Sequence, residues 1–190
     1  MTIRAIGAAV AFGLALAGAA DANPLKSLYT TIELKSCRQV KRHADGGAWL
    51  CPGLEGYPVY VADGDQRTFV SVGVSPDKRQ AATQTLVAFN SLFKGKSDRA
   101  TLEWRIVRRD GRPMPFATIQ KYYTRDDRRT GEVLVVTRVT DKEDCHVAHI
   151  DALANPDAIA LARQVADRDA RSFNCASKPG RVGKTGRSPM

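Results

Sequence analysis

Alternating apolar and polar positions predict that most of this chain forms β-strands. Between Thr101 and Arg108, apolar Leu102, Trp104 and Ile106 alternate with polar residues, a period of two that is typical of a strand with one buried face. Short turns between such runs favour hairpins, and Asp-Gly is a strong hairpin signal, so we expect an antiparallel meander. The predicted strands are 29–37, 57–62, 67–75, 101–108, 116–124, 132–140 and 145–150.

Two other segments have helical periodicity. Ser75-Pro76-Asp77 and Asn155-Pro156-Asp157 each combine a capping residue, a proline suited to the first helical position and an acid near the positive helix end. Apolar positions recur at helical spacing after each of them, which predicts one helix from 75 and another over 156–172. Residues 38–56, rich in Gly, His and charge, are expected to form a loop. Because the strands do not alternate with helices, we predict an α+β fold in which two helices pack on one face of an antiparallel sheet.

Residues 1–22 predict a signal peptide. Arg4 precedes an uncharged run of 16 residues, 5–20, and Ala20-Asp21-Ala22 fits the small-x-small cleavage pattern. The run is shorter than the roughly 20 residues that cross a bilayer, which disfavours the alternative of an uncleaved membrane anchor. We therefore expect cleavage after Ala22, a single domain over 23–175, no transmembrane segment in the mature chain, and a periplasmic or secreted location.

The chain is basic, with 29 Lys+Arg against 20 Asp+Glu in 190 residues and a net charge of +9. This composition excludes collagen-like, wholly disordered and multi-span membrane proteins. Residues 176–190 are rich in Gly and Pro and contain no acid, which predicts a disordered basic tail. A charge run is usually a solvated face, and the functional alternative is attraction to an anionic partner.

The four cysteines, Cys37, Cys51, Cys145 and Cys175, all belong to the mature chain. In an oxidising compartment an even number of cysteines predicts disulfides, and four cysteines permit three pairings. We favour Cys37–Cys51 with Cys145–Cys175 because each bond closes a local segment. The alternative, a zinc site, would need a closely spaced Cys or His pair that the sequence lacks.

Catalytic chemistry has little support in the sequence. His146 and His149 flank two strand residues, so they should point to opposite faces and could not share a metal ion without a bulge. A thiolate–imidazole pair at Cys145-His146 is disfavoured because adjacent strand residues face away from each other. No nucleophile-elbow, phosphate-loop or dinucleotide motif is present, so we assign no catalytic residue, metal or cofactor. The enzymatic alternative is a small hydrolase using His43 or His146 with a nearby acid.

Binding is the favoured function class. Aromatic side chains beside cations are useful contact groups, although Trp49 could equally be core that covers a disulfide. Nucleic acid is not expected, because no basic-aromatic recognition motif occurs and export argues against it. We predict a non-catalytic exported domain that associates with anionic envelope material or an envelope protein. The candidate contact residues are Arg38, Lys41, Arg42, His43, Trp49 and Tyr57.

One stretch carries a resemblance. The sequence ADGGAWLCPG at 44–53, followed by GYPVYV at 56–61, resembles a small family of uncharacterised exported proteins from Gram-negative, alphaproteobacterial-type genomes. The similarity continues through CHV at 145–147 and DALANP at 151–156, and covers roughly residues 29–175. It implies periplasmic residence and the two cysteine pairs, and it brings no activity and no catalytic residues.

Overall fold

The protein is described by a computed structural model that covers residues 25–190, so the expected signal peptide and cleavage site lie outside the described residues. Its strands form a seven-stranded sheet and a four-stranded sheet. The large sheet has the order β1-β7-β8-β9-β10-β11, with β6 paired to the end of β8, and all its pairs are antiparallel except β10–β11. Its strands are β1 (Lys26–Glu33), β6 (Phe89–Ser91), β7 (Arg99–Arg109), β8 (Arg112–Arg125), β9 (Thr130–Val139), β10 (Asp144–Asp151) and β11 (Gly180–Arg181). The small antiparallel sheet has the order β2 (Arg38–His43), β3 (Gly46–Leu54), β4 (Tyr57–Gly64) and β5 (Arg67–Val72).

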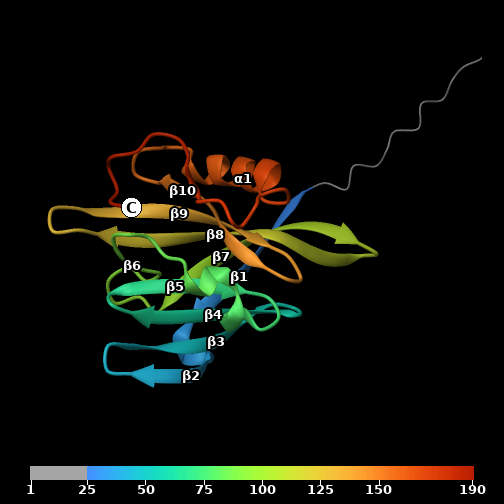
Figure 1. The fold of residues 1–190 in the computed structure, drawn as a ribbon, viewed down its shortest axis with the longest axis horizontal. Coiled ribbons are helices and arrows are strands. Elements are labelled where there is room, and N and C mark those ends of the chain that lie inside the picture. Colours follow the sequence, from blue (N-terminus) through green and yellow to red (C-terminus); the bar gives the residue numbers. More distant parts are fainter. Residues whose placement is uncertain (1–24) are drawn as a thin grey trace, which may run out of the picture.

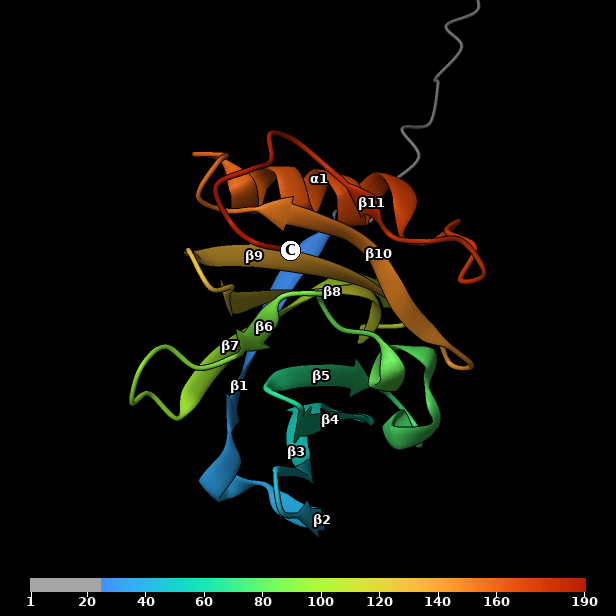
Figure 2. The ribbon, with the colours of Figure 1, turned by 60° about the vertical axis from the view of Figure 1, so that its left-hand side comes forward.

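The elements stack as three layers, with the large sheet in the middle (Figures 1 and 2). The small sheet packs on one face, and a core that includes Trp104, Tyr122 and Val61 fills the space between the two sheets. The helix α1 (Ala158–Asp169) covers the other face, over a second core that includes Ala162 and Val165. Both faces of the central strands are therefore buried, and the charged residues that alternate along β7 lie beneath the helix.

The antiparallel sheets and the C-terminal helix confirm the prediction in part, but the helix predicted from residue 75 is wrong. The chain there forms only two short 3-10 turns, Pro76–Lys78 and Gln80–Thr83, before it extends into β6. Ser75 has φ 52° and ψ 56°, a left-handed conformation, instead of the extended conformation of a helix cap. Leu86 is buried in the core between the sheets, so tertiary contacts override the helical pattern.

The loop predicted over 38–56 is instead the β2–β3 hairpin. Its glycines permit close packing: a Cβ atom on Gly46 would lie 2.1 Å from the Asp63 carbonyl oxygen, and one on Gly47 would lie 3.0 Å from the Trp49 ring. The disulfide Cys37–Cys51 joins the start of this hairpin to β3. The second disulfide, Cys145–Cys175, joins β10 to the chain after α1, so both favoured pairings are confirmed.

Residues 176–190 were predicted to be disordered, but they lie against the large sheet. Gly180–Arg181 forms β11, and the buried Asp151 carboxylate accepts a hydrogen bond from the backbone N–H of Ser188 at 2.8 Å. Met190 packs against the core between the sheets. The tail is held by a buried acceptor on a distant strand, which composition alone does not reveal. Within residues 25–190, no helix has the length and apolar character needed to cross a bilayer.

Candidate functional site

Strand β2 gathers the basic residues of the predicted contact group. It is the free edge of the small sheet, and all six of its side chains are exposed. Among residues 25–190, none of Arg38, Lys41 and Arg42 has an acidic side chain within ion-pair distance. Within the described part of the chain, the Arg42 guanidinium donates only to the Gln39 side-chain oxygen, at 3.1 Å. This edge therefore presents positive charge that no neighbouring carboxylate neutralises.

The aromatic residues of the predicted group are not on that edge. Trp49 is half-buried and packs against the core between the sheets. Tyr57 is also half-buried, with its ring edge-on to Trp104 at a centroid distance of 6.4 Å. His43 is exposed at the end of β2, opposite Gly46. The structure thus brings the cations together with His43 and places Trp49 and Tyr57 largely in the core.

His146 and His149 lie on the same face of β10, contrary to the sequence prediction. A bulge between His146 and Ala148 shifts the register, and His146 Nδ1 lies 3.2 Å from His149 Nε2. Burial lowers the pKa of His146 to about 3 and that of His149 to about 4. No third Cys, Asp, Glu or His in the described part of the chain completes a metal site with this pair.

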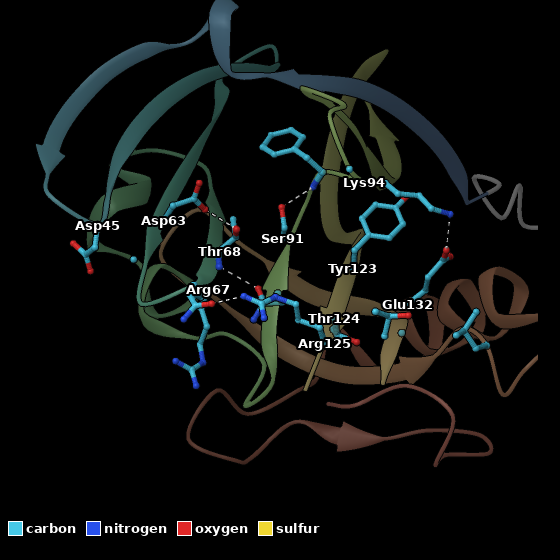
Figure 3. Close-up of a pocket in the computed structure, with 18 residues that line it drawn as sticks. Asp45, Asp63, Arg67, Thr68, Ser91, Lys94, Tyr123, Thr124, Arg125 and Glu132 are labelled. Atoms are coloured by element: carbon cyan, nitrogen blue, oxygen red, sulfur yellow. Dashed lines mark hydrogen bonds and ion pairs between the residues drawn. The ribbon is translucent and has the colours of Figure 1, made fainter. Parts of the chain in front are cut away.

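A groove of about 620 Å³ opens where the β4–β5 hairpin of the small sheet faces β6, β8 and β9 of the large sheet (Figure 3). Asn90 fixes this arrangement. Its side-chain oxygen accepts from the Thr68 backbone N–H at 3.1 Å, and its amide nitrogen donates to the Ala88 carbonyl at 2.9 Å. The charged and polar side chains that line the groove are Asp45, Asp63, Gln66, Arg67, Thr68, Asn90, Ser91, Lys94, Tyr123, Thr124, Arg125, Thr130 and Glu132.

The two walls of the groove hold carboxylates in different environments. Asp63 accepts a hydrogen bond from the Thr68 hydroxyl at 2.6 Å and has no basic partner among residues 25–190, and burial raises its pKa. Glu132 lies 2.8 Å from the Lys121 ammonium and 3.6 Å from that of Lys94, and hydrogen bonding to Lys121 lowers its pKa. Asp63 is therefore the less compensated acid.

Two guanidinium groups lie at one end of the groove, over the ring of Phe89. The Arg67 and Arg125 carbons are 5.2 and 5.0 Å from the ring centroid, a cation–π arrangement that orients both side chains. Arg67 also donates to the Val87 carbonyl at 3.0 Å, and Arg125 donates to the Gln66 side chain.

Sequence reasoning missed this groove, because its lining comes from separate segments between Asp45 and Leu153. The nearest signal was the Asp-Gly turn at 63–64, which indicated a hairpin and gave no hint of the strands opposite. Comparison with known proteins finds no matching family model, no matching curated protein and no matching solved structure.

Proposed function

We propose that this protein is an exported, non-catalytic binding domain that associates with anionic envelope material through β2. The observation that carries the proposal is the free sheet edge with three cations that have no ion-pair partner within residues 25–190. The anion we propose is the phosphate of acidic lipid head groups. The two disulfides fit an exported protein; the periplasmic location, cleavage after Ala22 and the family resemblance are parts of the proposal.

The energetics suit a reversible surface contact. A basic side chain near an anionic membrane contributes about 1 kcal/mol, so Arg38, Lys41 and Arg42 together contribute about 3 kcal/mol. These side chains are already exposed and would keep most of their hydration at a membrane surface. The attraction decays over about 8 Å at physiological ionic strength, so binding should weaken strongly in salt.

The geometry gives less support to the hydrolase alternative. His146 is only 1% exposed, so a substrate could not reach its ring. His43 is exposed, but no acidic side chain in the described residues contacts it to form an acid–base pair.

Co-sedimentation with lipid vesicles tests the proposal. The chain from Asn23 to Met190 would be mixed with vesicles containing phosphatidylglycerol, and with neutral phosphatidylcholine vesicles, at low and high salt. We expect binding only to the anionic vesicles at low salt, and its loss in the double variant Lys41→Glu/Arg42→Glu. The matched control, Arg109→Glu/Arg112→Glu, makes the same charge change on the exposed β7–β8 turn and should retain most of the binding.

Two outcomes contradict the proposal. Equal losses in both double variants would mean that net charge, and not the β2 edge, drives binding. Salt-resistant binding to native envelope combined with no binding to protein-free vesicles would indicate an envelope protein as the partner.

A further inference from the structure

The groove between the sheets differs from the rest of this basic protein in its charge. The acidic side chains that line it are Asp45, Asp63 and Glu132, and the basic ones are Arg67, Lys94 and Arg125. The formal charge of the lining is therefore zero, while the whole chain carries +9. Arg67 is already paired with Asp65, and Glu132 with Lys121 and Lys94, so much of the charge in the lining is compensated before any ligand binds, which favours a neutral ligand.

Several polar groups in the groove have unused hydrogen-bonding capacity within residues 25–190. Asp63 uses one carboxylate oxygen for the Thr68 hydroxyl and leaves the other without a partner. The Ser91 oxygen accepts from the Phe93 N–H at 3.0 Å, which leaves its own proton free to donate. Among residues 25–190, no group hydrogen-bonds the Tyr123 hydroxyl. Donors and acceptors are therefore interspersed along the groove, a pattern that matches a ligand with many hydroxyl groups.

Apolar surface accompanies these polar groups. Phe93, Tyr123 and Leu153 all line the groove, and the Lys94 ammonium lies 5.7 Å from the Tyr123 ring centroid, over one face of that ring. The C–H faces of sugar rings pack well against such surfaces, while their hydroxyls both donate and accept. The volume of about 620 Å³ lies within the range of roughly 300–1,000 Å³ that is usual for small-molecule sites.

The walls are held in place before any ligand arrives. The Asn90 side chain links β6 to β5, and its backbone N–H donates to the carbonyl of Gln66, in the turn before β5, at 3.0 Å. The Asp63 carboxylate is oriented by Thr68, and the Glu132 carboxylate by Lys121. Binding to such a preorganised site costs little conformational entropy.

We propose that this groove binds a neutral oligosaccharide, with Asp63 accepting hydrogen bonds from its hydroxyls and Phe93 and Tyr123 contacting its ring faces. The site is separate from the β2 edge and does not rest on the function proposed for that edge.

Titration followed by ¹⁵N–¹H correlation spectra tests this assignment. Maltotriose and chitotriose would be added separately to the ¹⁵N-labelled chain, up to millimolar concentration. We expect saturable shift changes, with at least one of the two sugars, in amides that line the groove. The isosteric variant Asp63→Asn should weaken binding about tenfold, since it replaces a charged acceptor by a neutral one. Its matched control is Asp77→Asn, an exposed residue that does not line the groove, and it should leave affinity unchanged.

Other results would overturn the proposal. Absence of saturable shifts with both trisaccharides would do so, as would shifts that map outside the groove. Preferential groove binding of glucose 6-phosphate, or of the polycation spermidine, would replace a neutral ligand with a charged one. If Asp63→Asn disturbs the fold, Tyr123→Ala provides a second variant, and the wild-type shift map already decides the site. The β2 variant Lys41→Glu/Arg42→Glu should bind the sugar normally, so the two proposals can fail independently.

Discussion

The two faces of the large sheet are covered in different ways. On the helix side, the core contains small residues such as Ala162 and Ala166, and charged side chains connect β7 to α1. Arg105 on β7 donates to the Asp167 carboxylate with two nitrogens, at 2.8 and 2.7 Å. Arg163 on α1 donates to Glu103 in the same two-pronged way, at 2.7 and 3.1 Å.

On the small-sheet side, large apolar side chains dominate, and buried polar side chains accept hydrogen bonds from backbone N–H groups. Trp104 and Tyr122 are fully buried there. Asp144 on β10 accepts from the Val72 N–H at 2.8 Å and from the Ala81 N–H at 3.3 Å. The helix is therefore attached by a core of small apolar side chains supplemented by buried ion pairs, whereas the two sheets are joined mainly by large apolar side chains.

The largest expected effect is on the small-sheet side. Trp104→Ala should lower the free energy of unfolding by about 4 kcal/mol, because it removes a fully buried ring and leaves a cavity. Under the helix the side chains are smaller, so Val165→Ala removes only two methyl groups and should cost about 1.6 kcal/mol. Urea unfolding followed by circular dichroism measures both values. Equal losses would contradict the view that large apolar burial is concentrated between the sheets.

Removing each disulfide separately sharpens the comparison. In the chain-entropy description, Cys145→Ala/Cys175→Ala should cost about 3.5 kcal/mol and Cys37→Ala/Cys51→Ala about 3 kcal/mol. Amide hydrogen exchange should show lost protection in α1 only for the first variant, since that bond joins β10 to the chain after the helix. Lost protection of α1 in the second variant would argue against separate attachment of the two layers.

The ion pairs under the helix should contribute less. Asp167→Ala should cost about 2 kcal/mol, between the values for exposed and fully buried pairs, because Arg105 is only 8% exposed and loses its partner. The double variant Arg105→Met/Asp167→Ala should regain part of this loss, since no unpaired charge remains. Thermal unfolding at fixed pH measures both, and an additive double variant would show that the pair is not coupled.

The smallest effect expected is the change in folding stability with pH that comes from His149 on β10. Burial lowers the pKa of His149 to about 4, below the 6.5 of an exposed histidine. The unfolded chain therefore binds more protons in this range, and the contribution of His149 to stability is fully present above pH 6.5 and lost as the pH falls toward 4. Between pH 7 and pH 5 the loss is about 1–2 kcal/mol.

The variant His149→Gln should show a correspondingly smaller loss of stability between those pH values in chemical unfolding. Burial raises the pKa of Asp144 to about 6, so that group titrates in the opposite sense over the same range. The difference between the variant and the wild type cancels the contribution of Asp144 and, to first order, that of His146, whose pKa is also lowered mainly by burial. An identical pH dependence in both proteins would show that the His149 proton is not linked to folding.

The sequence predicted the elements whose local pattern agrees with their tertiary setting. The runs at 101–108, 116–124 and 132–140 became β7, β8 and β9, and the stripe over 156–172 contains α1. The alternation along β7 indicated two faces but not what covers the charged one, and Glu103 and Arg105 are in fact buried. Their partners, Asp167 and Arg163, lie some 60 residues away on α1.

The remaining errors share a physical cause, which is contact between distant segments. Gly46 and Gly47 indicated a loop, although they permit the close approach of Asp63 and Trp49. The bulge in β10 turns His149 to the face of His146, and no local residue pattern predicted it. The cations of the candidate contact surface were predicted. Whether a strand lies at the edge or inside the sheet follows only from the sheet order, and this difference places Arg42 on the surface and Trp49 against the core.

The exposed edge of β2 also matters at high protein concentration. An unpaired strand edge offers N–H and C=O groups to any other strand, and basic side chains there repel a second copy and oppose aggregation. A polyanion that neutralises Arg38, Lys41 and Arg42 would remove this repulsion. Crowding on an anionic surface would therefore favour edge-to-edge pairing of neighbouring copies. The charge that we propose attracts the protein to a surface would thus also oppose self-association in solution.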